Sequence, residues 1–83
     1  MTFRVLVRVM PRAGLLDPEG QAVERALVEL GFRDASEVRM GRAVELSVEA
    51  GSAEGAGRQV QAMCERLLAN PVTEDFSFEV IAS

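Results

Sequence analysis

Residues 3–10 read FRVLVRVM, an alternating stretch around which the remaining segments can be arranged. Two sets of side chains alternate along it, so each set points to one side of an extended backbone. The first set is apolar: Phe3, Val5, Val7 and Val9. The second set is mixed: Arg4, Leu6, Arg8 and Met10. The alternation predicts a β-strand with one face in the core and the other face exposed.

A helix is expected after the loop at residues 11–14. Asp17 can cap it, because its carboxylate accepts an otherwise unpaired backbone N–H, and Pro18 is tolerated at the first helical position. Gly31 suits the left-handed position that ends such a helix. Apolar residues recur at helical spacing and form one stripe: Val23, Ala26, Leu27 and Leu30.

The next segment predicts a hairpin. Residues 37–40 are expected to form a short strand, with Gly41 and Arg42 as its turn. Residues 43–49 alternate again, with three apolar side chains on one side and three polar side chains on the other. Two strands joined by a tight turn are therefore expected between the first helix and the second.

A second helix and a last strand complete the chain. Ser52 can cap the helix, and Asn70 with Pro71 ends it, because the residue before a proline avoids the helical region. The expected apolar stripe is Val60, Met63, Cys64 and Leu67. Residues 73–81 alternate once more and predict the final strand.

The predicted order β-α-β-β-α-β suggests an α+β, ferredoxin-like fold. We expect one domain over residues 1–83, with a four-stranded antiparallel sheet. Because β-α-β crossovers are right-handed, both helices are expected on one face of that sheet. The other face would then be left uncovered by the chain itself.

That uncovered face is expected to carry a ladder of opposite charges. The first strand would lie between the third and the fourth, so Arg4 and Arg8 would be flanked by carboxylates from both sides. Those carboxylates are Glu45, Glu49, Asp75 and Glu79. Two interpretations stay open: a solvated, salt-bridged face, or a polar protein–protein surface with Leu6 and Met10 as apolar anchors.

Composition narrows the function classes. The formal net charge of −4 weighs against binding nucleic acid or an anionic membrane. There is no His, and the single cysteine rules out an internal disulfide and points to the cytoplasm. Cys64 lies on an apolar stripe, where a core position is favoured over a nucleophile. No phosphate-binding glycine motif is present, so we assign no catalytic, cofactor-binding or metal-binding residue.

Three stretches together resemble the PurS family, the small subunit of phosphoribosylformylglycinamidine synthase. The first is LDPEGQAV at residues 16–23. The second is VRMGR at residues 38–42, followed by Glu45 and Leu46. The third is MCERLLANPV at residues 63–72, followed by EDF at 74–76. The resemblance covers nearly the whole chain.

This resemblance implies a non-catalytic assembly subunit in de novo purine biosynthesis. The family's complex uses ATP, glutamine and formylglycinamide ribonucleotide. A PurL-type subunit carries the synthetase chemistry, with ATP and Mg, and a PurQ-type subunit releases ammonia from glutamine. PurS-like subunits are homo-oligomers that bridge the other two and support a protected ammonia route. This sequence departs from the family's common pattern at three positions: Arg42 for Lys, Ala43 for an aromatic residue, and Phe76 for Tyr.

Candidate contacts to partners follow from these two lines of reasoning. Arg39 and Arg42 would flank the hairpin glycine and could pair with acidic groups, while Arg4, Arg8 and Glu45 would lie on the open sheet face. One alternative is an ACT-type domain that senses small molecules, since it shares the element order. An acylphosphatase-like hydrolase is disfavoured, because residues 11–16 supply Arg12 but no Asn.

Overall fold

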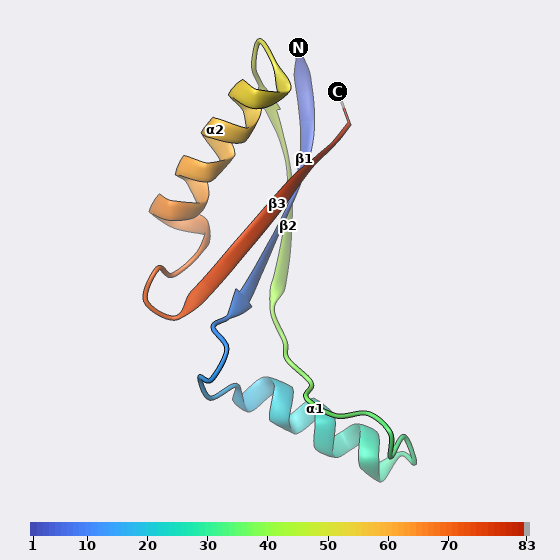
Figure 1. Cartoon of the computed structure of the whole chain (residues 1–83). Coiled ribbons are helices and arrows are strands. Elements are labelled where there is room, and N and C mark those ends of the chain that lie inside the picture. Colours follow the sequence, from blue (N-terminus) through green and yellow to red (C-terminus); the bar gives the residue numbers. More distant parts are fainter. Residues whose placement is uncertain (83) are drawn as a thin grey trace.

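The computed structural model describes residues 1–82 and consists of three long strands and two helices, the second extended by a π-helical turn (Figure 1). In chain order the elements are β1 (Thr2–Pro11), α1 (Pro18–Glu29), β2 (Arg42–Glu49), α2 (Ala53–Met63), η1 (Cys64–Leu68) and β3 (Glu74–Ala82). Both predicted caps are confirmed. The side chain of Asp17 accepts the N–H of Gly20 at 3.0 Å, and that of Ser52 accepts the N–H of Gly55 at 3.0 Å.

β1 is the central strand of an antiparallel sheet with the order β2-β1-β3. Val7, at its middle, lies opposite Val44 of β2 and Phe78 of β3. The alternation predicted for residues 3–10 is confirmed, because every apolar residue of the first set is buried and both arginines of the second set are exposed. The sheet therefore has one apolar face and one charged face.

The expected fourth strand is absent, and the four-stranded sheet is a wrong prediction: the described chain has three strands. Residues 38–41 run without strand pairing, and Glu37 has a positive φ of 55°. Carboxylate side chains accept the backbone N–H groups that pairing with another strand would require. The N–H of Val38 donates to Glu24 at 2.9 Å, and that of Met40 donates to Asp17 at 2.9 Å. The predicted hairpin turn is also wrong, because Arg42 is the first residue of β2.

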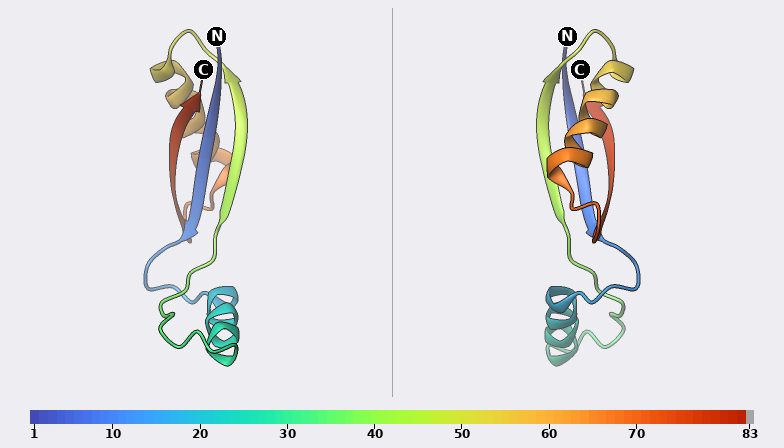
Figure 2. Two further views of the ribbon diagram at one scale, coloured as in Figure 1. Left: turned by 90° about the vertical axis from the view of Figure 1, so that its right-hand side faces the viewer. Right: turned by 90° about the vertical axis from the view of Figure 1, so that its left-hand side faces the viewer.

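Only α2 packs on the sheet, so the expectation of two helices on one face is also wrong. α1 lies beyond the ends of the strands (Figures 1 and 2), and none of its side chains belongs to the core. The radius of gyration is 16.0 Å, whereas a compact domain of this length would have about 12 Å. Since α1 is bound to its own return segment by the carboxylates of Asp17 and Glu24, it does not fold back onto the strands.

The core is a thin layer between the sheet and α2. Its buried residues are Phe3, Val5, Val7, Val9, Val48, Ala56, Val60, Cys64 and Ala69. Val60 and Cys64 lie in the predicted stripe, and both are fully buried. Leu67 was expected beside them but is 81% exposed. The reason is η1, in which the N–H of Ala69 bonds to the carbonyl of Cys64 five residues earlier, so the apolar stripe rotates out of register.

Gly57 offers a stabilising substitution within α2. A Cβ at this position would lie 3.7 Å from Phe78 Cε1, an ordinary van der Waals distance. Alanine also loses less backbone freedom on folding than glycine does. We expect Gly57→Ala to raise the free energy of unfolding by about 0.5–1 kcal/mol in urea titrations. The same change at Gly31, where φ is +101°, should lower it. Equal effects at both sites would contradict this account.

Candidate functional site: the charged sheet face and the Arg42 corner

The open sheet face carries ion pairs between neighbouring strands. Arg4 lies 3.3 Å from Glu45 of β2, and Arg8 lies 3.0 Å from Glu79 of β3. These pairs are diagonal, because Leu6 is the residue directly opposite both Glu45 and Glu79. The four charged side chains of these two pairs thus surround the apolar side chain of Leu6. The predicted ladder forms in part, because Arg4 and Arg8 each pair with one carboxylate, whereas Glu49 and Asp75 do not pair with them.

The outer carboxylates of the ladder have other partners. Glu49 pairs with the hydroxyl of Thr2 and with the terminal amine of Met1, and Asp75 pairs with Arg12. All of these side chains except Thr2 are between 48% and 76% exposed. Exposed pairs of this kind each contribute only about 0–1 kcal/mol to stability. The face is therefore suited to exchange partners, since little free energy is lost when one pair opens.

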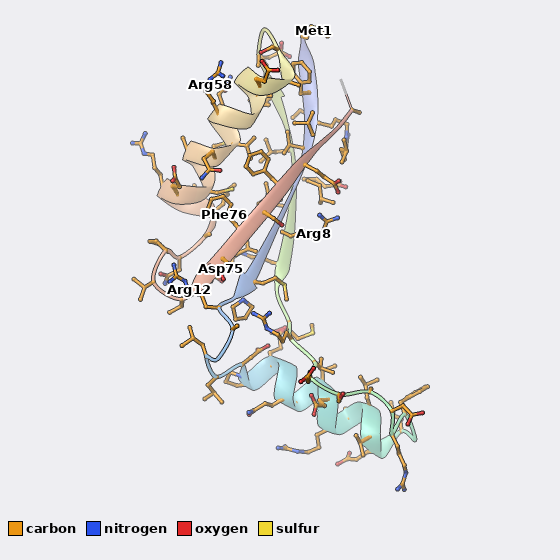
Figure 3. The ribbon with its side chains drawn as sticks, in the orientation of Figure 1. Met1, Arg8, Arg12, Arg58, Asp75 and Phe76 are labelled. Carbon is orange, nitrogen blue, oxygen red and sulfur yellow. The ribbon has the colours of Figure 1, made fainter. Side chains whose placement is uncertain are left out.

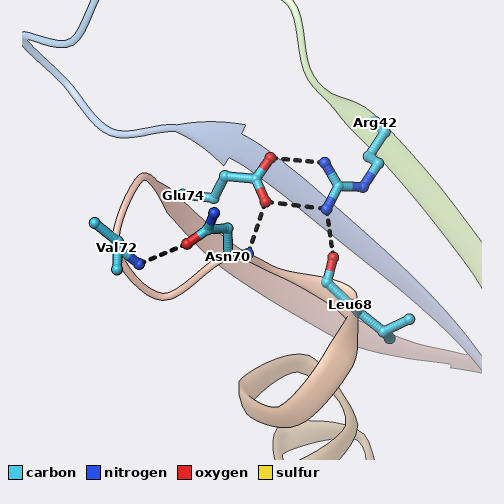
Figure 4. A network of polar contacts seen from close by, with 5 residues as sticks. All are labelled: Arg42, Leu68, Asn70, Val72 and Glu74. Atoms are coloured by element: carbon cyan, nitrogen blue, oxygen red, sulfur yellow. Dashed lines mark hydrogen bonds and ion pairs between the residues drawn. The ribbon is translucent and has the colours of Figure 1, made fainter.

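Arg42 occupies a different position from the one predicted. Its guanidinium binds Glu74 with two hydrogen bonds of 2.6 and 3.0 Å and donates to the carbonyl of Leu68 at 2.5 Å (Figure 4). Glu74 also accepts the N–H of Asn70 at 2.7 Å. We name Arg42, Leu68, Asn70 and Glu74 the Arg42 corner. It ties the start of β2 to the end of η1 and the start of β3.

The sequence did not point to Glu74 as a site residue, although Glu74 is the carboxylate that binds Arg42. The signal lay in the spacing of Asn70 and Glu74 after the helix. The side chain of Asn70 accepts the N–H of Val72 at 2.9 Å and shapes the turn that brings Glu74 back to the helix end. Such an Asx turn is a local signature of Asn before Pro. Its meeting with Arg42, 32 residues earlier, is a matter of tertiary structure.

Glu74 should make the folded state sensitive to acid. The side-chain hydrogen bond from Arg42, followed by the N–H of Asn70, holds the pKa of Glu74 below its ordinary value. A carboxylate of this kind stabilises the fold above its unfolded pKa of about 4.3, and the contribution is lost as the pH falls through the lower, folded pKa. We expect urea titrations from pH 7 to pH 3 to show a smaller loss of stability for Glu74→Gln than for the wild type. Glu29→Gln, at the exposed end of α1, should lose as much as the wild type. An unchanged acid dependence in Glu74→Gln would contradict this assignment.

Arg12 joins the loop before β3 to the end of β1. Its guanidinium donates to the carbonyl of Pro71 at 2.6 Å and lies 3.5 Å from Asp75, and its own N–H donates to Thr73 at 2.9 Å. Arg12 and Asp75 lie at the same end of the sheet in Figure 3. A hollow of about 520 Å³ opens beside them, lined in part by Cys64 and by Phe76. Arg12 thus holds a loop in place and does not form an anion-binding loop of its own.

Arg39 is separated from the other predicted contacts. Its side chain is exposed, and it lines a hollow of about 410 Å³ together with residues 13–17, Gln21, Glu37 and Val38. The nearby Asp17 accepts from Met40 and Gly20, and these two hydrogen bonds lower its pKa, with a smaller effect from the charge of Arg39. The structure therefore groups Arg4, Arg8 and Glu45 on one face and places Arg39 and Arg42 elsewhere.

Cys64, the first residue of η1, is fully buried. Burial raises the pKa of its thiol, with a further contribution from the neighbouring charge of Glu65. A thiol in this setting stays protonated and packs as an apolar group. Across residues 1–82, no group of three or more acidic, Cys or His side chains is arranged to hold a metal ion. No helix within that range is long and apolar enough to cross a membrane.

Comparison with known families gives a match over residues 4–82 to the PurS model, described as phosphoribosylformylglycinamidine (FGAM) synthase. The chain belongs to the PurS family. The PurS subunit of Synechocystis is 40% identical over 98% of this chain and 81% of its own length. The PurS subunit of Bacillus subtilis is also 40% identical, over 94% of this chain and 92% of its own. This membership favours the PurS prediction over the ACT-type alternative.

Solved PurS structures share the fold. The PurS subunit of Thermotoga maritima superposes with a TM-score of 0.91 at 33% identity, over 98% of this chain and 93% of that one. Methanocaldococcus jannaschii PurS gives 0.86 at 32% identity, over 98% of each chain. A chain in the structure of PurLQS from Thermotoga maritima gives 0.91 at 33% identity, over 98% and 99%. Because these TM-scores apply to 98% of this chain, α1 is part of the superposed fold.

Proposed function

We propose that this PurS chain is the non-catalytic assembly subunit of phosphoribosylformylglycinamidine synthase and bridges a PurL-type synthetase and a PurQ-type glutaminase. The observation that carries the proposal is its full-length similarity to a chain of the PurLQS structure. The buried, protonated thiol of Cys64 agrees with a role that does not require a nucleophile. In this proposal ATP and Mg bind the large subunit, the complex works in the cytoplasm, and PurS supports ammonia transfer and associates with itself.

Reconstitution tests this function. Purified PurL-type and PurQ-type subunits from the same source are mixed with and without PurS, and product formation is measured with glutamine and, separately, with ammonium chloride. We expect glutamine-dependent synthesis and the large complex, sized by light scattering, to require PurS. Ammonia-dependent synthesis should persist without it, because the synthetase chemistry lies on the large subunit. If glutamine-dependent rate and complex size do not change on adding PurS, the proposal is wrong.

The open sheet face is the surface that we propose for one of these partners. Arg4, Arg8 and Glu45 lie together there and are more than half exposed, so a partner can replace their present ion pairs. Arg39 is a second, separate contact, and Arg42 contributes through the Arg42 corner that positions β3. The double variant Arg4→Glu/Arg8→Glu should weaken complex formation with unchanged circular dichroism. Arg58→Glu, on the exposed side of α2, is the control. Equal complex formation by both variants would exclude this face.

A further inference from the structure

The charges on the open sheet face form a pattern that repeats itself after a half turn about Leu6. Arg4 and Arg8 lie two residues from Leu6 along β1, in opposite directions, and Glu45 and Glu79 lie opposite it on β2 and β3. A half turn about an axis through Leu6, perpendicular to the sheet, exchanges the two arginines and also the two glutamates. The two ion pairs, of 3.3 and 3.0 Å, are therefore counterparts of each other. We name these four charged residues the charge quartet.

The same half turn relates the residues that surround the charge quartet. Each residue that β2 adds to the open face has a counterpart of the same character on β3, at the diagonally opposite position. These counterparts are Ser47 and Ser77, Ala43 and Ala82, and Glu49 and Asp75. Only the two ends of β1 differ, where Thr2 stands at one end and Met10 at the other. The repeat therefore covers the whole open face except these ends.

The arrangement of the charge quartet determines what can bind to it. Its positive side chains lie along β1 and its negative side chains lie across the sheet, so their net charge is zero. Arg8 points away from α2 (Figure 3), and all four side chains are more than half exposed. Complementary charges at an interface fix the register of a partner and disfavour wrong partners. A face with no net charge therefore selects its partner by where the charges lie and not by their sum.

The small width of the sheet argues against a second copy of this chain on the open face. Two such faces are complementary only when β1 of one copy crosses β1 of the other at a right angle, because only then does each arginine meet a glutamate. Strands lie about 4.8 Å apart, so two crossed three-stranded sheets overlap over a patch about 14 Å on a side. Stable interfaces bury about 800 Å² on each partner, several times the area of that patch. A broader surface, which extends along the whole of β1, is required.

We infer that the open sheet face binds a surface of one synthase subunit that carries the inverse of the charge quartet. On that surface two carboxylates and two basic side chains alternate around one apolar side chain. The carboxylates lie over Arg4 and Arg8, the basic side chains lie over Glu45 and Glu79, and the apolar side chain meets Leu6. The inference rests on the assembly function proposed above and states the chemistry that the open face recognises.

Reversing the charge quartet tests this inference. The variant Arg4→Glu/Arg8→Glu/Glu45→Arg/Glu79→Arg exchanges all four charges but keeps the net charge and allows both internal ion pairs, so it should fold as the wild type does by circular dichroism. The partner would then meet a like charge at every position. We expect the dissociation constant from immobilised PurL-type and PurQ-type subunits, measured by surface plasmon resonance, to rise about 100-fold. The matched control, Glu54→Arg/Arg58→Glu, exchanges two exposed charges on α2 and should bind as the wild type does.

The outcomes separate this inference from the assembly function. If the reversed variant binds as tightly as the wild type, the charge quartet is only a solvated surface and the inference is overturned, while the assembly function stands through another surface. If wild-type PurS itself does not bind the two subunits, the assembly function fails. Light scattering of Arg4→Glu/Arg8→Glu without other subunits should give the size of wild-type PurS alone. A smaller size would mean that a second copy covers the open face, and this too would overturn the inference.

Discussion

Gly20→Val should loosen α1 from its return segment. Gly20 is the one buried residue of α1. A Cβ at this position would lie 2.5 Å from the carbonyl oxygen of Val38 and even closer to the Asp17 carboxylate. That carboxylate accepts the N–H groups of Gly20 and Met40, so the clash acts on the contacts that hold the helix to the chain. Overpacking of this kind costs about 1–3 kcal/mol.

Hydrogen exchange of the whole protein measures this effect locally. The amide protons of Val38 and Met40 should exchange about 5- to 150-fold faster in Gly20→Val, which corresponds to about 1–3 kcal/mol. Amides in the middle of β1 should keep their wild-type rates, because α1 does not contribute to the core. Gly51→Val is the matched control, since nothing lies within 4 Å of a Cβ there. If the amides of Val38 and Met40 remain protected in Gly20→Val, the close packing at Gly20 is not what holds α1 to its return segment.

Val7→Ala should cost the whole protein about 2 kcal/mol of stability, as a methyl-deleting change in a packed core does. Val7 is fully buried at the centre of the sheet, between Val44 and Phe78. The described core has only nine buried residues, so few neighbours can move to fill the cavity. A domain of this size has about 4–12 kcal/mol of total stability, and this single deletion therefore removes a large fraction of it.

Urea denaturation followed by circular dichroism measures the loss. The midpoint should fall for Val7→Ala with little change in slope, since the same surface is exposed on unfolding. Val72→Ala removes the same two methyl groups from a side chain that is 76% exposed, and its stability should stay within about 0.5 kcal/mol of the wild type. Similar losses in both variants would mean that the core is not where the structure places it.

Local patterns were sufficient for much of this fold. Alternation alone placed Phe3, Val5 and Val7 in the core. The caps at Asp17 and Ser52 followed from residue type and position. These features were predictable because they depend on neighbours only a few residues away in the chain.

Most of the errors concern contacts between distant parts of the chain. Residues 37–40 have a strand-like pattern, but the carboxylates of Asp17 and Glu24 take the N–H groups of Val38 and Met40. Leu67 fits the helical stripe, yet the π-helical turn rotates it into solvent. Arg42 was predicted at a turn and instead binds Glu74. In the first and third cases a contact between distant residues decided the outcome, and in the second a local turn that helical periodicity does not predict.

The sequence by itself determined the inward face of β1, the helix caps, the buried position of Cys64 and the resemblance to PurS, because each is written in short-range periodicity or in residue type. Only the tertiary structure decided that the sheet has three strands, that α1 stands apart from it, and that Arg42 is held by Glu74. The physical reason is competition for backbone hydrogen bonds and apolar surface. Glu24 of α1 and its N-terminal cap Asp17 bind Val38 and Met40 of the return segment, so α1 does not pack on the sheet.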